Sequence, residues 1–260
     1  MSSIFGDLAP LRDRPITASQ QLKTAKATYK SIRADPGHEL FNSPLVNLSE
    51  LGISGAPAYA LAQTAPYFVS VPGAPETLMA RRSVADKLCR VNARCVPVGL
   101  ELFVFDAWRP AAVQAFFHDQ WMPQFLSDLY PGDTEEETAA RVTQYWATPS
   151  EDASTPSPHS TGGAVDLTLR WIDTGQPLWM GTQFDDAHER SHIDHFERGI
   201  DETSFSDVEA RASRRLLHWV MMEEGFAPHP NEWWHFSFGD PLWARLNGHD
   251  SFPFGAAQPA

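Results

Sequence analysis

The sequence predicts an α+β domain in which helices pack on a small, mostly antiparallel sheet. Three apolar segments rich in β-forming residues, 98–107, 164–169 and 233–238, are separated by segments with helical periodicity or helix-start signals. These helices and strands do not alternate with the regular βαβ spacing that a parallel sheet requires. A chain of 260 residues is long enough for one such domain with a substantial core.

The ends of the chain differ in character from its centre. Residues 1–45 are polar, with weak periodicity and scattered prolines, and predict an extended arm that either wraps on the body or mediates contacts in a homodimer. Within this arm we expect one short helix, from Ser19 to Ile32. The main domain is expected to cover 46–247, followed by a tail at 248–260. Its early part, 52–75, is punctuated by Gly and Pro and predicts loop with short strands.

The first helix of the domain is predicted over 75–92. Pro75 suits a helix start, and the apolar residues that follow recur near a 3.6-residue period. The buried strand 98–107 comes next. Pro110 then suits the first position of another helix, so Arg109 lies where the carboxyl end of a strand leads into a helix.

Two capping-box patterns, in which a Ser or Thr precedes a Glu by three residues, predict further helix starts. The pattern at 134–137 predicts a helix over about 134–147. The pattern at 206–209 begins a strong helix that stops at Gly225. Between the two helices, the segment 148–160 is rich in Ser, Thr and Pro and predicts a loop that precedes the strand 164–169.

Charge and composition exclude several classes of partner. The formal net charge is −13 and the pI is near 5.1, so phosphate backbones and anionic lipids are repelled and neither nucleic acid nor a membrane is expected as a partner. The N-terminus has no charged-then-apolar signal pattern, and no apolar run approaches the length of a membrane span, which predicts a cytoplasmic protein. Cys89 and Cys95 lack Cys-x-x-Cys spacing and are predicted to be plain core residues.

A metal site is predicted around a glycine turn. His159 leaves a loop, Gly162 and Gly163 turn the chain, and Asp166 lies in the strand that follows, so the two side chains can approach each other. His235, at the entrance of the last strand, would complete a set of two histidines and one carboxylate. Three protein ligands with an open fourth position is the arrangement of a catalytic zinc. The alternative is a hydrogen-bonded cluster without a metal.

Two more residues suit the remaining chemistry of hydrolysis. A zinc ion lowers the pKa of its bound water to about 7 and polarises a substrate carbonyl, but a proton must still move and an oxyanion must be stabilised. Glu232, three residues before a ligand, is the candidate acid and base, unless it is a surface carboxylate. Arg109 could stabilise the oxyanion, or it could form a salt bridge at the helix start. Asp106 either tethers Arg109 or belongs to a turn.

These residues carry a resemblance to a known family. The segments 157–166 and 232–236 resemble the two signatures of the D-alanyl-D-alanine metallopeptidases, which include dipeptidases of the vancomycin-resistance type and muramoyl-peptide carboxypeptidases. The segments 105–110 (FDAWRP) and 180–185 (MGTQFD), together with the Glu-Trp-Trp-His run, are similar to the dipeptidase branch. The resemblance spans roughly 55–245, and four signatures in the right order make it specific.

The resemblance implies a zinc-dependent peptidase that hydrolyses D-alanyl-D-alanine or a closely related free dipeptide. It implies one zinc ion per subunit on the three ligands named above, with Glu232 activating the zinc-bound water and Arg109 stabilising the transition state. Ser157 and Asp185 would bind the free amino group of the dipeptide, and Tyr59 matches an amino-end tyrosine. As alternatives, Asp185 could cap a turn and Ser157 could be an ordinary loop serine.

Two other functions stay open at this point. A carboxypeptidase or endopeptidase of the same family, acting on peptidoglycan stems, would need an open groove and would make Asp185 superfluous. A non-catalytic, zinc-stabilised binding protein would normally have four protein ligands. The arm and the region 128–156 depart from the family pattern, which leaves substrate size and oligomeric state open. The biological role, whether antibiotic resistance, wall recycling or scavenging, is open as well.

A second histidine pair has zincin spacing but is not expected to bind zinc. The run 188–192 reads His-Glu-Arg-Ser-His, with two histidines at i and i+4. Its intervening and flanking residues are polar, so it offers no apolar stripe for a buried helix, and we predict a solvated segment. Trp233 and Trp234 are expected to alternate between core and cleft wall. Four histidines without ligand spacing are predicted to be structural: His118, His218, His229 and His249.

Overall fold

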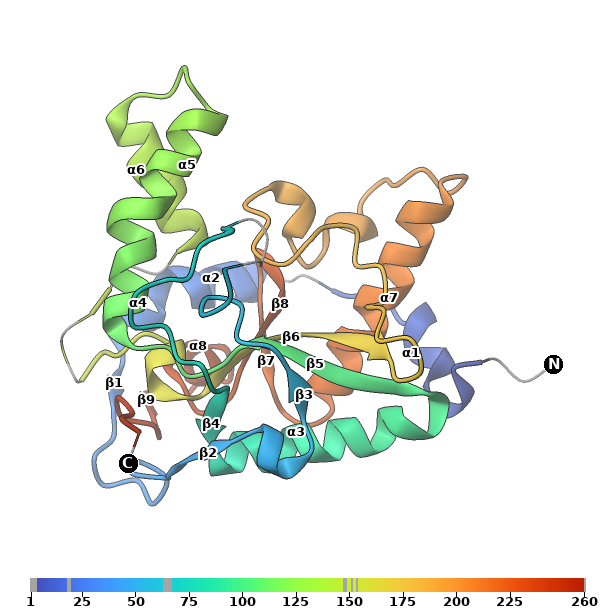
Figure 1. Ribbon diagram of the computed structural model, residues 1–260, viewed down its shortest axis with the longest axis horizontal. Coiled ribbons are helices and arrows are strands. Elements are labelled where there is room, and N and C mark those ends of the chain that lie inside the picture. The colour runs from blue at the N-terminus through green and yellow to red at the C-terminus, as the bar shows by residue number, and fades with distance from the viewer. Residues whose placement is uncertain are drawn as a thin grey trace.

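The computed structural model describes residues 4–17, 20–62, 67–146, 149–150, 152 and 154–259. Within these residues a five-stranded sheet with the order β3-β5-β6-β8-β7 forms the centre of the molecule (Figure 1). β3 runs parallel to β5, and every other neighbouring pair is antiparallel, which confirms the predicted α+β class and the mostly antiparallel sheet. The strands are β3 (Ser54–Gly55), β5 (Leu100–Asp106), β6 (Ala164–Trp171), β7 (Ala227–His229) and β8 (Glu232–Ser237).

Two small strand pairs in the described residues connect distant parts of the chain. β1 (Arg33–Ala34) pairs in parallel with β9 (Ser251–Phe252), so the N-terminal arm meets the C-terminal tail. β2 (Leu45–Asn47) pairs antiparallel with β4 (Met79–Arg81). Cys89 and Cys95 are free thiols and Cys95 is buried, as predicted.

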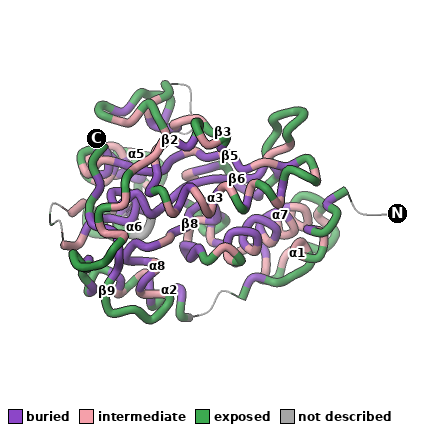
Figure 2. Tube along the Cα trace, turned by 90° about the horizontal axis from the view of Figure 1, so that it is seen from below, coloured by how far each residue is buried: buried purple, intermediate pink, exposed green. Residues whose placement is uncertain are grey.

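Helices surround the sheet. They are α1 (Ala9–Asp13), α2 (Gln20–Thr28), α3 (Arg82–Cys95), α4 (Ala111–Phe116), α5 (Met122–Leu129), α6 (Glu135–Tyr145), α7 (Phe205–Met222) and α8 (Pro241–Leu246). α3 packs against β5, and α7 packs against β7 and β8, while the pair α5 and α6 projects from the body (Figure 1). Figure 2 shows that β5, β6 and β8 are largely buried, whereas much of the outer chain is exposed. In the described chain no helix combines the length and apolarity needed to cross a membrane.

Two of the predicted helix starts are wrong. The helix expected from Pro75 begins only at Arg82, because 79–81 is drawn into a strand by pairing with 45–47. The cap of α7 is Ser204, which lies two residues before the predicted cap, Ser206. The Ser204 hydroxyl accepts a hydrogen bond from the backbone N–H of Asp207.

Other sequence signals are confirmed, apart from a shift of one residue at Pro110. Thr134 caps α6, and it forms a complete capping box with Glu137. Pro110 is the N-cap of α4 rather than its first helical residue. The predicted loop 148–160 ends in a single 3₁₀ turn at His159–Thr161, and its residues 148, 151 and 153 lie outside the described part of the chain.

The N-terminal arm packs on the body. α1 contacts α7, where Arg12 Nη2 lies 2.7 Å from Glu209 Oε2 and the indole of Trp219 donates to the carbonyl of Arg14 at 2.9 Å. α2 and the following 3₁₀ turn, Tyr29–Ser31, correspond to the predicted arm helix, whose first residue lies outside the described residues. A role of the arm in dimer contacts stays a prediction.

Arg81 ties three distant segments together. Its buried guanidinium donates to the carbonyls of Thr161 at 2.7 Å, of Gly255 at 2.6 Å and of Ser43. These carbonyls belong to the turn that follows His159, to the C-terminal tail and to the arm. The arginine therefore connects the two ends of the chain to the turn that carries a predicted metal ligand.

We expect Arg81→Met to lower the free energy of unfolding by about 3 kcal/mol, because two buried carbonyls and one half-buried carbonyl would lose a charged donor. Urea denaturation followed by circular dichroism measures the change. The neighbouring Arg82, which forms an exposed ion pair with Asp86 at 3.0 Å, supplies the control. Arg82→Met should change stability by less than about 0.5 kcal/mol. Equal losses in the two variants would contradict the role assigned to Arg81.

Candidate metal centre and active site

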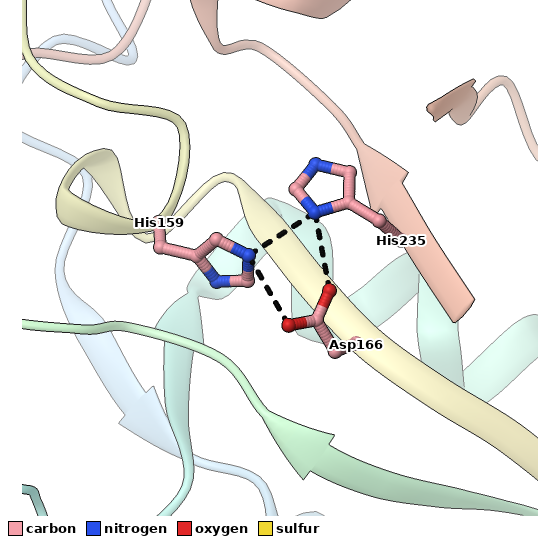
Figure 3. A group of neighbouring side chains, drawn as sticks. All are labelled: His159, Asp166 and His235. Carbon is pink, nitrogen blue, oxygen red and sulfur yellow. Dashed lines mark hydrogen bonds and ion pairs between the residues drawn. The ribbon is translucent and has the colours of Figure 1, made fainter. Parts of the chain in front are cut away.

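Sheet register brings two of the predicted ligands together. β6 and β8 are antiparallel neighbours in which Asp166 lies directly across from His235. His159 reaches the same point from the 3₁₀ turn before β6 (Figure 3). Gly162 closes this turn with φ of +72°, a left-handed conformation that favours glycine, and a Cβ there would lie 2.6 Å from Leu45 Cδ2. The predicted glycine turn is therefore confirmed.

The three side chains have the spacing of ligands around one ion. His159 Nε2 lies 3.1 Å from His235 Nδ1 and 3.4 Å from Asp166 Oδ2, and His235 Nδ1 lies 3.1 Å from Asp166 Oδ1. Two atoms each about 2.0 Å from a tetrahedral zinc would lie roughly 3.3 Å apart. In the described part of the chain, this is the one group of His, Cys, Asp or Glu residues that could hold a metal ion.

The surroundings of the ligands also fit a cation. His159 Nδ1 lies 2.8 Å from the carbonyl of Ala107, and His235 Nε2 lies 3.1 Å from Ser237 Oγ, so each of these nitrogens can keep its ring proton while the other ring nitrogen faces the ligand group. Asp166 Oδ1 is buried without a hydrogen-bond partner. Burial opposes ionisation of Asp166, but the neighbouring charge of His159 outweighs it and holds the pKa of the carboxyl well below its usual range. An ionised carboxylate and two imidazole nitrogens converge here, and a divalent metal would take the place of the proton on the facing nitrogen of His159.

Glu232 stands beside this group at the start of β8. Its Oε2 lies 3.8 Å from His235 Nδ1, and its Oε1 lies 3.3 Å from His229 Nδ1. Burial raises the pKa of the Glu232 carboxyl to about 7. A carboxyl that titrates near neutrality can both accept and return a proton, which is what an acid–base residue must do.

Arg109 is held rigidly next to the ligands. Its Nε donates to Asp106 Oδ2 at 2.9 Å and its Nη1 donates to Gln114 Oε1 at 2.8 Å, so Asp106 does tether the arginine. Nη2 lies 3.3 Å from Asp166 Oδ2. Burial disfavours the charge of the guanidinium, but the carboxylate of Asp106 holds the pKa of Arg109 above its ordinary value. The side chain is therefore a fixed, buried cation.

Asp185 lies at the end of a hydrogen-bond chain that begins at Arg109. Arg109 Nη2 donates to the hydroxyl of Tyr59 at 3.2 Å, and Tyr59 donates in turn to Asp185 Oδ2 at 2.8 Å. Tyr67 donates to the same oxygen at 2.7 Å. Asp185 has φ of +59°, which is unusual for a residue with a side chain and often marks a functional position. Burial raises the pKa of its carboxyl to about 7.

One cavity of about 610 Å³ brings the predicted residues together. It is lined by all of them except Tyr59, which reaches the site through its bond to Asp185: Arg109, Ser157, His159, Asp166, Asp185, Glu232 and His235. Trp234 lines the cavity, whereas the indole of Trp233 donates to Thr182 in the interior at 2.8 Å, so the two tryptophans alternate as predicted.

Sequence reasoning missed three residues of this site. Gln114 positions Arg109, Tyr67 holds Asp185, and His229, predicted to be merely structural, lines the cavity beside Glu232. Gln114 lies in the first turns of the helix that follows Arg109, so the predicted helix start could have indicated that the two side chains lie close together. No motif singles out Tyr67 or His229, because their positions depend on how loops and strands pack.

The second histidine pair does not lie on an α-helix. Glu189–Ser191 is a short 3₁₀ turn and His188 precedes it with extended backbone, so the two histidines of the run do not share an α-helical face. His188 forms an ion pair with Asp186. His188, Glu189 and Arg190 are exposed, which fits the predicted polar segment, although Ser191 is buried. The expectation that the run binds no zinc stays a prediction.

The fold and the site define a metal-dependent hydrolase, and comparison with known proteins identifies its family. The model of the peptidase M15 family, described as D-Ala-D-Ala dipeptidase, matches residues 53–252. The chain therefore belongs to this family of dipeptidases. The resemblance drawn from the sequence motifs, and with it the assignment to a zinc peptidase family, is confirmed.

Several relatives carry the name D-alanyl-D-alanine dipeptidase. One from Synechocystis is 39% identical over 55% of this chain and 62% of its own length. One from Enterococcus faecium is 33% identical over 65% of this chain and 77% of its own length. One from Escherichia coli is 34% identical over 53% of this chain and 55% of its own length. The match thus spans less than two thirds of the Synechocystis and Escherichia coli proteins. Among solved structures, VanYB in complex with D-alanine-D-alanine is similar with a TM-score of 0.40 and 14% identity, covering 72% of this chain and 88% of VanYB.

Proposed function

We propose that this protein hydrolyses D-alanyl-D-alanine, or a closely related free dipeptide, with one zinc ion held by His159, Asp166 and His235. The observation that carries the proposal is the half-buried Asp185, whose carboxylate lines the same cavity as the ligands and Glu232 and is held by two tyrosine hydroxyls. A carboxylate inside a cavity is a suitable partner for the free ammonium group of a short peptide. The dipeptidase name of the relatives supports the same substrate class.

The metal and the protein divide the chemistry between them. When bound, zinc supplies a Lewis acid that polarises a carbonyl and lowers the pKa of water toward about 7. Glu232 takes the proton of the attacking water and returns it to the departing amine, a double use that its pKa near 7 favours. Arg109, fixed by Asp106 and Gln114, presents a positive charge to the oxyanion that develops at the scissile carbonyl.

The amino end of the substrate would be read by Asp185 and Ser157. The two tyrosine hydroxyls hold the carboxylate of Asp185 in one orientation, and burial makes an incoming ammonium a strongly preferred partner. Ser157 is buried on the same cavity and offers its hydroxyl as an additional acceptor. An acyl group on the substrate amine would remove the charge and leave the carboxylate without a partner.

We expect kcat/KM for D-Ala-D-Ala to exceed that for N-acetyl-D-Ala-D-Ala by at least about 100-fold, because the acetylated peptide has no ammonium to pair with the carboxylate of Asp185. Release of D-alanine measures both reactions. In Asp185→Asn this preference should shrink, while zinc content stays the same. Comparable rates on the two peptides in the unaltered protein would favour the carboxypeptidase that trims peptidoglycan stems.

Three further expectations stay predictions. They are a cytoplasmic location, a homodimer built with the N-terminal arm, and the domain boundaries at 46 and 247. None of them is needed for the proposed reaction.

A further inference from the structure

The lysines of this protein are concentrated at one place. The sequence contains four lysines against a formal net charge of −13, and three of the four are Lys23, Lys26 and Lys30. Their spacing of three and seven residues puts them on one face of a helix. All three line the cavity that holds the metal ligands and Glu232. An acidic protein thus directs most of its lysines toward its own active site.

The helix that carries them is fixed in place. α2 and the turn after it bury Leu22, Ala25 and Tyr29 on another face, where they pack with apolar residues of the body. These partners are Ile193, Leu242 and Leu246. Burial of the apolar residues on the other face of the helix therefore holds the lysines beside the cavity.

Lys26 lies at the side of the cavity where Glu232 stands. It is the one of the three that is half-buried, and its charge interacts with Glu232 and Lys30. The charge of Asp185 interacts with Asp166 and Arg109, and its effect on Glu232 is smaller than that of Lys26. Lys23 and Lys30 form no ion pair with a carboxylate in the part of the chain that the structure describes. The cavity thus has a cationic wall near Glu232 and a separate anionic group at Asp185.

This polarity matches a zwitterionic dipeptide. If Asp185 binds the ammonium and Glu232 protonates the departing amine, the leaving residue lies on the Glu232 side, and its carboxylate is one carbon away from that amine. We propose that Lys26, flanked by Lys23 and Lys30, binds the free carboxylate of the leaving residue. This inference rests on the proposed dipeptidase function. The three lysines lie outside residues 53–252, so they add to the family's site a feature supplied by the arm of this chain.

The site would then read both ends of its substrate. A longer peptide, or one with a blocked carboxyl group, would bring no negative charge to the lysine wall. Lysine side chains are suited to binding the substrate carboxylate, because each ammonium group offers three donors and the flexible side chain adapts to the position of the carboxylate.

A comparison of D-Ala-D-Ala with D-alanyl-D-alaninamide tests the proposal, because the amide lacks only the negative charge. The quantity to measure is the ratio of kcat/KM for the acid to kcat/KM for the amide. We expect Lys26→Met to lower this ratio by about 10- to 100-fold, the loss of one charged hydrogen-bonded pair. Any effect of the substitution on Glu232 acts on both substrates and cancels. Lys26→Gln, a second uncharged variant, should behave alike, and Lys26→Arg should retain most of the preference.

The fourth lysine supplies a matched control. Lys87 lies on α3, where it donates to the carbonyl of Glu224, and it does not line the cavity. Lys87→Met should leave the acid-to-amide ratio unchanged. An unchanged ratio in Lys26→Met and Lys26→Gln would overturn the lysine proposal and leave the dipeptidase function intact.

If the unaltered protein hydrolyses neither substrate, the proposed function fails. The Kd of D-Ala-D-Ala, measured by calorimetry, then tests separately whether Lys26 binds the carboxylate. A Kd raised about 10-fold or more in Lys26→Met would support them. A Kd equal to that of the unaltered protein would overturn them.

Discussion

Glu232→Gln should lower kcat for D-Ala-D-Ala by about 10²- to 10⁴-fold while one zinc ion stays bound per chain. Glutamine has nearly the same shape but cannot take a proton from water or return one to the departing amine. The geometry supports a large effect, because Glu232 lies 3.8 Å from a ligand nitrogen and its pKa is about 7. Among the described carboxyl groups of the cavity, Asp185 also has a pKa of about 7, but its carboxylate is already held by two tyrosine hydroxyls.

Rates of D-alanine release and zinc content by atomic spectroscopy measure the two parts of this expectation. Glu136→Gln on the exposed first turn of α6 is the matched control and should keep full activity. Retention of more than about a tenth of the rate in Glu232→Gln would contradict the acid–base role. If the unaltered protein holds zinc but has no hydrolytic activity, the non-catalytic binding protein becomes the better description.

His235→Gln should release the zinc ion and reduce hydrolysis by more than about 10³-fold. Two remaining ligands cannot fill the site, and the polarisation that the metal contributes to the transition state amounts to several kcal/mol. The measurement is the zinc content after dialysis, followed by the rate of D-Ala-D-Ala hydrolysis with and without added zinc.

His229→Gln separates a ligand from a neighbour. His229 lies in the same cavity, 3.3 Å from Glu232, but its nitrogens do not belong to the converging group, so this variant should still bind one zinc ion. Full zinc content in His235→Gln, or its loss in His229→Gln, would show that the ligand set is wrong.

Local signals account for most of the elements that were predicted correctly. The apolar run of β5, the capping box of α6 and the spacing of the buried face of α3 each depend on residues close in the sequence. The misplaced cap of α7 was a local error of two residues, whereas the wrong start of α3 arose where a distant segment decided the outcome. Residues 79–81 could have extended the helix, but pairing with 45–47 satisfies their backbone groups as a strand instead.

The sequence by itself determined the family and singled out the proposed ligands and their neighbours, because these residues stand in short motifs at a glycine turn or a strand edge: His159, Asp166, His235, Glu232 and Arg109. Only the tertiary structure decided that Tyr67 holds Asp185, that His229 stands beside Glu232 and that three lysines of the arm line the cavity. These contacts join segments far apart in the chain. They follow from burying the apolar faces of strands and helices against one another, and no local spacing records which faces meet.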